Sequence, residues 1–248
     1  MVLSIIDLLK NNKDIIIIGI IILLLIVITI LGIFRNKKKK FKVSDMACIG
    51  VFSAFSIVLY FLKFNLPFIF PSFLEINFSL LPIIIIGYML GPIEAITVVL
   101  IRAFIKVQFT STFCVGEFAD LLIGIPVALV TSLIYKKNHT KKGALLSLLF
   151  GSLIWIVISI FTNCFINVPF FLELYCGGNE EAFVGALSII PGVNVDNYMS
   201  KYIFYAVIPF NTLLSSIVSL VTFLVYKKIS ILFNKITKNQ ELDSELGN

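Results

Sequence analysis

Residues 73–106 read FLEINFSLLPIIIIGYMLGPIEAITVVLIRAFIK. The stretch holds two apolar runs joined by Gly91-Pro92, a pair that favours a tight turn over a loop. Both runs are continuous and not alternating, which predicts helices and argues against the strands of a β-barrel. Pro82 and Gly87 interrupt the first run, and a membrane helix tolerates them where neighbouring helices satisfy the freed backbone groups. We therefore expect a helical hairpin inside a bilayer.

The composition extends this expectation to the whole chain. Of its 248 residues, 59% are hydrophobic and 14% are charged, and the mean hydropathy is +1.04. Soluble domains are usually about 45–50% apolar and about 25% charged. The core of a soluble domain of this size could not hold so many apolar residues, so we expect many of them to contact lipid. The net charge of +6 is divided into short blocks between apolar runs, which fits membrane topology and not nucleic-acid binding.

About seven apolar segments are candidates for helical spans. The first, 15–34, carries no charge and is followed by the basic block Arg35–Lys40. Its length and this stop-transfer block indicate a retained helix and not a cleaved signal peptide. The other spans are expected at 45–63, 78–91, 92–109, 116–135, 144–168 and 202–226.

The fold class is therefore all-α: a polytopic membrane protein with a six-helix core and one additional N-terminal transmembrane helix. We expect residues 1–41 to form that helix and a basic linker, residues 42–233 to form the six-helix membrane domain, and residues 234–248 to form a polar, frayed tail.

The distribution of basic residues predicts the orientation. They gather at 35–42, at 136–142 and from Lys227 onward, and seven spans place all three groups on one side. Residues 169–200 instead contain acidic residues and no Lys or Arg. We expect a multi-pass protein of the cell membrane with its C-terminus in the cytoplasm and its N-terminus outside.

Ionisable side chains within predicted spans are costly and are therefore functional candidates. Arg102 and Lys106 are four residues apart and share a helix face, while Glu117 and Asp120 are three apart and share a face of the next helix. These charges could pair and hold the two helices together, or they could border a ligand cavity open to the outside. The two interpretations are compatible.

Neutral polar residues are candidates for the same cavity. Asn163 and Asn211 lie in the last two predicted spans, where an amide needs either a partner helix or a polar ligand. Asn77 and Ser79 stand at the start of the short span. Residues 64–76 are rich in aromatics and proline. They could cap the cavity as a lid or lie in the headgroup zone as an interfacial loop.

Small residues on one helix face suggest a docking surface. Ala47, Gly50 and Ala54 share a face of the helix predicted at 45–63, and such faces let helices approach closely. A partner membrane protein could dock there, although the pattern is also common by chance.

Enzyme and metal motifs are absent from the sequence. It contains no CxxC, HExxH, GxSxG or Walker A motif. We expect no enzyme activity, and energised transport would need a separate ATPase. Cys114 and Cys176 could share the outer face and form a disulfide, but no spacing requires one. His139 is the only histidine, lies in a Lys-rich loop, and is not expected to bind or catalyse.

The order of several motifs resembles the riboflavin-type substrate-binding (S) components of energy-coupling factor (ECF) vitamin importers. Each motif is loose, but their order and spacing together are typical of that family over about residues 42–233. The motifs are the stretch at 73–106, VGEFADLLIGIPVALVTSLIYKKNHTKKGA at 115–144, TNCFINVPFF at 162–171 and YAVIPFNTLLSSIVSLVTFLVYKKIS at 205–230.

The resemblance implies a vitamin-binding subunit with definite partners. Such a subunit docks on a transmembrane coupling subunit with two ABC-type ATPases, and Ala47, Gly50 and Ala54 match the docking face. No cofactor is implied, and riboflavin is the expected transported ligand. Asn163 and Asn211 would hydrogen-bond the polar edge of the flavin, and aromatic rings would stack on its face. The expected ligand-binding residues are Phe73, Asn77, Glu117, Asp120, Asn163, Phe165 and Asn211.

Several positions depart from the family pattern. Leu80 and Leu214 stand where the family often has an acidic residue and a Lys, and Arg102-Ala103 stands where it often has Lys-Asn. Because these changes alter the polar edge of the pocket, a different small ligand on the same scaffold is an alternative. An intramembrane enzyme using Glu117 and Asp120 as acid and base, or a transporter working alone, is less favoured.

Overall fold

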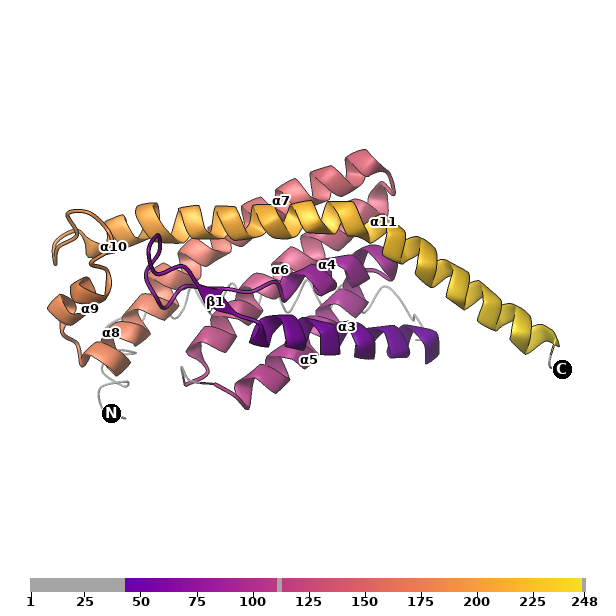
Figure 1. Cartoon of the computed structure of the whole chain (residues 1–248), viewed down its shortest axis with the longest axis horizontal. Helices are drawn as coiled ribbons and strands as arrows, with labels where there is room; N and C mark the ends of the chain where they lie inside the picture. The colour runs from indigo at the N-terminus through magenta and orange to yellow at the C-terminus, as the bar shows by residue number, and fades with distance from the viewer. Residues whose placement is uncertain (1–42, 111–112, 247–248) are drawn as a thin grey trace.

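The structure is a computed structural model that describes residues 43–110 and 113–246 (Figure 1). The expected N-terminal span, its basic linker and the position of the N-terminus lie outside the described residues. The helices are α3 (Val43–Phe61), α4 (Leu80–Met89), α5 (Pro92–Val107), α6 (Val115–Lys137), α7 (Lys141–Thr162), α8 (Val168–Cys176), α9 (Glu180–Ala186), α10 (Tyr198–Tyr202) and α11 (Ile208–Leu246). Two π-helical turns, η1 (Asn163–Asn167) and η2 (Ile203–Val207), and a short antiparallel pair, β1 (Phe64–Asn65) and β2 (Glu75–Ile76), complete the chain.

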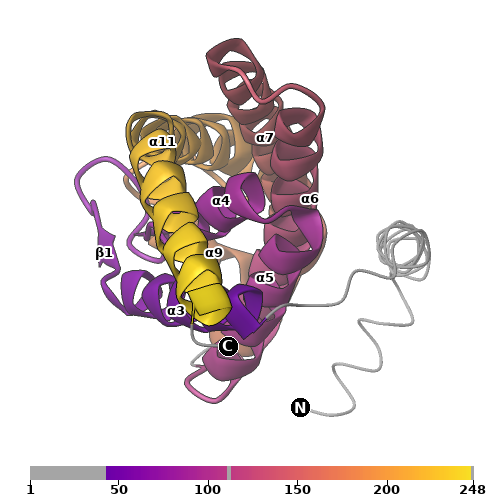
Figure 2. The same cartoon turned by 90° about the vertical axis from the view of Figure 1, so that its right-hand side faces the viewer.

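The short helix α4 lies at the centre of the bundle. Figure 2, which looks along the long axis, shows α4 surrounded by α3, α5, α6, α7 and α11. Every residue of α4 except Met89 is buried, as expected for a helix that is apolar on all sides. Gly87 allows close packing here, because a Cβ at this position would collide with the Ser132 side chain of α6. The tight turn predicted at Gly91-Pro92 is present, with Gly91 at φ 124° and Pro92 in the first turn of α5.

In the part of the chain that the structure describes, four helical stretches are long and apolar enough to cross a bilayer. They are Val43–Phe61, Val115–Lys137, Lys141–Cys176 and Tyr198–Ile229, and they overlap four of the predicted spans. The expectation at 78–91 differs from the structure, because α4 has only 10 residues. At 1.5 Å per residue it is about 15 Å long, which is half of the ~30 Å of hydrocarbon. The helical membrane class is supported, whereas the expected count of seven spans is not established.

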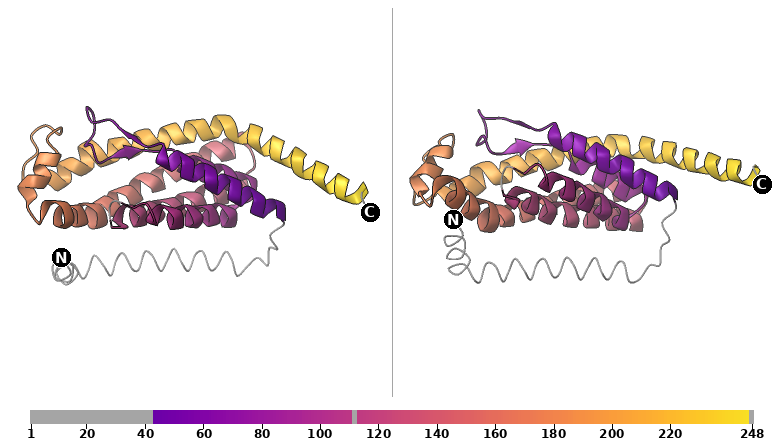
Figure 3. Two further views of the ribbon diagram at one scale, coloured as in Figure 1. Left: turned by 60° about the horizontal axis from the view of Figure 1, so that its bottom comes forward. Right: turned by 90° about the horizontal axis from the view of Figure 1, so that it is seen from below.

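Different helices form the two ends of the bundle. Helices α8, α9 and α10 lie together at one end, and the start of α3 lies toward the opposite end, beyond which α11 projects (Figures 1 and 3). In the structure α11 continues to Leu246. The expectation of a polar, frayed tail at 234–248 stays a prediction.

Candidate functional site

A cavity of about 180 Å³ lies at the end of the bundle formed by α8, α9 and α10. Its wall is mainly aromatic and aliphatic, with a few polar groups, as in typical small-molecule sites. The volume is below the about 300–1,000 Å³ of such sites, so a ligand of that class would have to displace part of the wall. The lining residues are Phe73, Leu74, Val115, Gly116, Asn163, Asn167, Val168, Phe170, Phe171, Leu174, Tyr175, Phe183 and Tyr202.

Aromatic rings from distant parts of the chain meet at this cavity. The Phe73 ring, on the segment before β2, lies 5.2 Å from that of Phe171 in α8 and 5.8 Å from that of Tyr202 in α10. The ring of Phe183 in α9 is stacked on Phe73 at 6.4 Å. Such contacts stabilise each ring pair by about 0.5–1.5 kcal/mol beyond area burial. The cavity wall therefore ties three short helices to the segment between β1 and β2.

The segment at 64–76 covers the cavity in part and faces outward in part. Phe73 and Leu74 belong to the cavity wall, and Phe70 is buried with its ring 5.3 Å from that of Phe210 in α11. Phe68, at the tip, is 93% exposed. Phe73 and Leu74 therefore lie where a lid would, whereas a place in the headgroup zone for the exposed tip stays a prediction.

An amide network forms the polar side of the cavity. The hydroxyl of Tyr202 donates to Asn163 Oδ1 at 2.9 Å, and Asn163 Nδ2 donates to the carbonyl of Ser159 at 2.8 Å. The Ser159 hydroxyl and Trp155 Nε1 donate to Asn211 Oδ1 at 3.0 and 3.1 Å. Asn163 lines the cavity, and Asn211 lies behind it, joined through Ser159. The structure thus brings together the two asparagines singled out from the sequence.

Three members of this network were missed by sequence reasoning: Ser159, Trp155 and Tyr202. A signal existed for Ser159, because it precedes Asn163 by four residues and shares its helix face. Buried Trp and Tyr usually need a partner for their polar atoms, but which partner they find depends on packing between segments far apart in the chain.

Asn163 is the first residue of the π-turn η1, and Asn211 lies in α11 about one turn after η2. Val168, after η1, and Ile208, after η2, each donate a backbone hydrogen bond to the carbonyl five residues earlier. Pro169 and Pro209 follow directly. A proline inside a helix has no N–H and clashes with the carbonyl four residues back, which the wider turn accommodates. Such π-turns occur frequently at functional sites.

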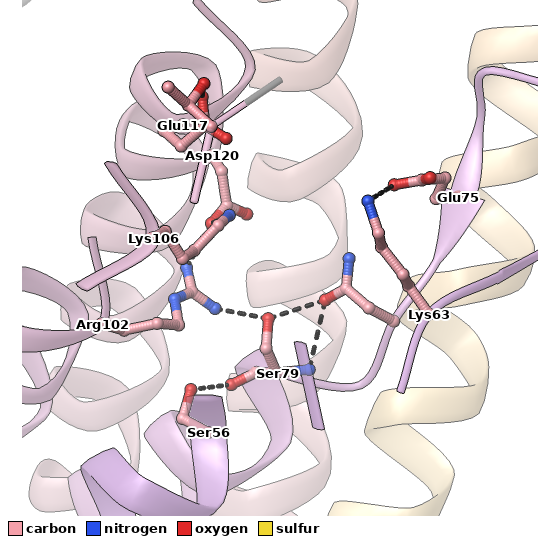
Figure 4. A network of polar contacts seen from close by, with 10 residues as sticks. Ser56, Lys63, Glu75, Ser79, Arg102, Lys106, Glu117 and Asp120 are labelled. Carbon is pink, nitrogen blue, oxygen red and sulfur yellow. Dashed lines mark hydrogen bonds and ion pairs between the residues drawn. The ribbon is translucent and has the colours of Figure 1, made fainter. Parts of the chain in front are cut away.

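A second polar group, the charged cluster, lies between α5 and α6 (Figure 4). Asp120 Oδ2 lies 2.8 Å from Arg102 Nη2 and 2.7 Å from Lys106 Nζ. Arg102 Nη1 donates to the Ser79 hydroxyl at 2.6 Å, and that hydroxyl donates to Asn77 Oδ1 at 2.7 Å. The pairing that the sequence suggested for Asp120 is therefore present, and Asn77 joins the same cluster instead of the cavity wall.

The cations of this cluster are deeply buried. The Arg102 side chain is 0% exposed and that of Lys106 is 3% exposed. Lys106 Nζ also lies 3.8 Å from the centre of the Tyr60 ring, a favourable cation–π position. The Arg102–Asp120 contact is a close ion pair without hydrogen-bond alignment, and Arg102 Nε has no hydrogen-bond partner within the described residues.

Glu117 lies one turn before Asp120 in α6. It is buried and accepts a hydrogen bond from the Thr110 hydroxyl at 2.8 Å. It is the neighbour in sequence of Gly116, which lines the cavity. Together with Asp120 it formally balances the charges of Arg102 and Lys106.

The remaining predicted site residues lie on the surface. Phe165 is 37% exposed, with its ring 4.8 Å from that of Phe161, and is not among the cavity-lining residues. Ala47, Gly50 and Ala54 are all exposed on α3. A Cβ added at Gly50 would have no atom within 4 Å, so this face of α3 is open.

The cysteines and the histidine play no part in the cavity. Cys48, Cys114, Cys164 and Cys176 all lie in the described residues and are free, so the disulfide considered for Cys114 and Cys176 is absent. His139 packs edge-on against Tyr135 at 5.1 Å. Within residues 43–110 and 113–246, no three His, Cys, Asp or Glu side chains gather to hold a metal ion.

Comparison with known proteins decides the family. The family model of the ECF transporter, substrate-specific component, matches residues 44–226, most of the chain. The chain belongs to this family. A solved structure described as "Structure and mechanism of the S component of a bacterial ECF transporter" matches with a TM-score of 0.57 and 27% identity, covering 76% of this chain and 96% of that chain.

Curated relatives of this S component are named riboflavin transporters. The chain is 26% identical over 204 residues to riboflavin transporter RibU of Staphylococcus aureus (strain TCH60), covering 81% of this chain and 100% of the relative. It is 27% identical over 201 residues to RibU of Streptococcus thermophilus (strain ATCC BAA-250 / LMG 18311), covering 77% of this chain and 85% of the relative. The resemblance inferred from motif order is therefore confirmed, and the family is one of transporter components and not of enzymes.

Proposed function

We propose that this S component binds riboflavin or a related flavin from outside the cell for ATP-driven uptake. One observation carries the proposal: a cavity walled by Phe73, Phe171 and Tyr202 and bordered by the amide of Asn163. A flavin offers a flat ring to such a wall and a polar edge of donors and acceptors to such an amide. The names of the relatives point to the same ligand.

The polar edge of the ligand would meet the amide network. An Asn side chain can donate and accept at once, so Asn163 could exchange hydrogen bonds with a carbonyl and an N–H on one ring edge. Asn211, held by Trp155 and Ser159, would fix the position of Asn163 from behind. The stacked wall would supply most of the apolar contact.

Release into the cell would require partners. The sequence contains no Walker A motif, so a coupling subunit with two ABC-type ATPases would supply the energy. The open face of Ala47, Gly50 and Ala54 would allow a partner helix to approach closely. By the positive-inside rule the Lys-rich end is cytoplasmic, which puts the cavity on the outer side.

The test is direct binding by the purified full chain. We expect a yellow flavin spectrum in the purified protein, or nanomolar binding of added riboflavin without ATP. Replacing Asn163 by Leu should weaken binding, whereas Asn138→Leu, an exposed Asn in the turn before α7, should not. A colourless, correctly folded protein that ignores riboflavin would contradict the proposal.

A second candidate is a different small planar ligand. Leu80 and Leu214, where the family pattern suggests charged residues, are 3% and 4% exposed and belong to the apolar core. Neither residue lines the cavity, so a ligand held by charged groups at these two positions is not expected here. Competition binding across a panel of vitamins separates the two candidates, because a clear preference for riboflavin would eliminate the second.

A further inference from the structure

A second hollow, which we call the α7–α11 groove, runs between the outward faces of these two helices. Its volume is about 410 Å³, and it shares no lining residue with the cavity. The Ser152 and Ser219 hydroxyls hydrogen-bond at 3.0 Å between its two sides. Its leucines are open to the surroundings, with Leu145, Leu149 and Leu220 59%, 54% and 61% exposed. In a bilayer these side chains would contact lipid tails.

Lysines continue both sides of the groove at one end. Lys141 and Lys142 precede Leu145 by four and three residues, so they lie on the groove face of α7. Lys227 follows the groove residue Phe223 by four residues and continues the face of α11. All three lysines are exposed.

The register of the two helices brings these lysines to the same mouth. The helices are antiparallel, and the Ser152–Ser219 bond sets their alignment. Leu145 precedes Ser152 by seven residues, and Tyr226 follows Ser219 by seven. The two residues therefore lie at about the same height along the helix axes. The contacts of Tyr88 agree, because its hydroxyl donates to the Ala144 carbonyl and its ring lies 5.4 Å from that of Tyr226. Lys227 is therefore within about one turn of Lys142 along the axis.

Charge complementarity identifies the occupant. Residues 141–162 and 208–229 contain no Asp or Glu, and the first acidic residue of α11, Glu241, follows Lys227 by 14 residues, about four turns. Basic pockets between transmembrane helices bind the headgroups of anionic lipids. We propose that the α7–α11 groove binds one anionic phospholipid, with its phosphate among Lys141, Lys142 and Lys227 and an acyl chain along the exposed leucines.

Native mass spectrometry of the full chain tests the headgroup. The protein is equilibrated with equal amounts of phosphatidylglycerol and phosphatidylcholine carrying the same acyl chains. We expect one phosphatidylglycerol to be retained in preference. The triple variant Lys141→Gln, Lys142→Gln, Lys227→Gln should lower its retention by about 100-fold and leave phosphatidylcholine unchanged.

A matched variant separates a site from general attraction. Lys136→Gln, Lys137→Gln, Lys228→Gln removes the same charge from the same end, but these residues lie on α6 or beside the groove face of α11. This variant should retain the preference. Equal retention of both lipids by the unchanged protein, or equal loss in the two triple variants, would overturn the proposal.

The acyl chain needs its own test. Ser216→Phe fills the groove at an exposed position and should reduce retention of long-chain phosphatidylglycerol at an unchanged unfolding temperature. Competition by inorganic phosphate as strong as that by the lipid would overturn the chain contact. A photoreactive residue at Ser216 should yield a lipid adduct, and an adduct with a protein segment would overturn the choice of occupant.

Discussion

The amide network and the charged cluster are both polar groups inside an apolar bundle. They differ in whether their polar atoms face the cavity or only one another. In the amide network, Asn163 is held by Tyr202 and Ser159 and still faces the cavity. In the charged cluster, Arg102 and Lys106 converge on one oxygen of Asp120 and are almost fully buried. The difference teaches that a polar residue in a membrane span indicates a ligand site only where its partners leave it open to a cavity.

The largest effect on stability is expected from removing the carboxylate of the charged cluster. Asp120→Asn removes the carboxylate that pairs with both buried cations, and breaking such a pair costs about 3–5 kcal/mol. We expect a large fall in the unfolding temperature of the purified protein. Glu181→Gln, at an exposed position at the start of α9, should leave it unchanged. Lost ligand binding at a normal unfolding temperature would show instead that Asp120 contacts the ligand.

A variant that removes all three charges of the cluster tests the same ion pairs in a second way. Replacing a buried ion pair by apolar residues of similar volume is often neutral or stabilising. The triple variant Arg102→Met, Lys106→Met, Asp120→Leu should therefore unfold at a higher temperature than Asp120→Asn alone. A triple variant less stable than the single one would mean that the charges themselves are needed for the fold.

Replacing Asn163 should lower ligand affinity and, to a smaller extent than Asp120→Asn, stability. Asn163→Leu removes a group that faces the cavity, which weakens binding, and it leaves the buried Tyr202 hydroxyl without its acceptor, which costs stability. The loss of one such hydrogen bond corresponds to about 1–3 kcal/mol, so we expect riboflavin affinity to fall about 10–100-fold in a titration. Unchanged affinity with a lowered unfolding temperature would assign this network to the fold alone.

Two phenylalanines provide a smaller, matched contrast. Phe73→Ala removes a ring from the cavity wall and should weaken riboflavin binding by about 3–10-fold, corresponding to the energy of one aromatic contact. Phe165→Ala changes a ring outside the cavity and should leave the titration unaltered. Equal losses in the two variants would place the ligand elsewhere.

The smallest effect is expected at the surface. Lys63 and Glu75 form an ion pair at 2.7 Å beside the β1–β2 pair, with side chains 34% and 42% exposed. Exposed pairs contribute about 0–1 kcal/mol. Lys63→Gln should therefore change the unfolding temperature by little, and the change should shrink further in high salt. A fall as large as that for Asp120→Asn would contradict this assignment.

Much of the helical framework could be predicted because continuous apolar runs are a direct signal of spans. The pairing of Arg102 with Asp120 also follows from spacing, since both lie on faces that a short connection brings together. The central place of α4 could not be predicted, because length and hydropathy do not say which helix the others surround. The contact of Tyr202 with Asn163 could not be predicted, because the two residues are 39 apart in sequence and only the packing of the helices brings them together.

The structure leaves Phe165 outside the cavity-lining residues, and its role in ligand binding stays a prediction of the motif resemblance. It follows Asn163 by two residues, about 200° around a regular helix, so the two side chains point to different sides. Phe171, about two turns after Asn163, lines the cavity.

The π-turn at Asn163–Asn167 has a consequence for chain length. Each residue of a helix advances the side-chain direction by about 100°, and η1 holds one residue more than an α-turn would. Deleting one residue there would restore a regular helix and would leave Phe171 and Tyr175 pointing nearly as they do now, because the wide turn holds its additional residue within the rotation of one α-turn. What the shortened helix would lose is the room for Pro169, whose ring would then meet the carbonyl of a regular α-turn.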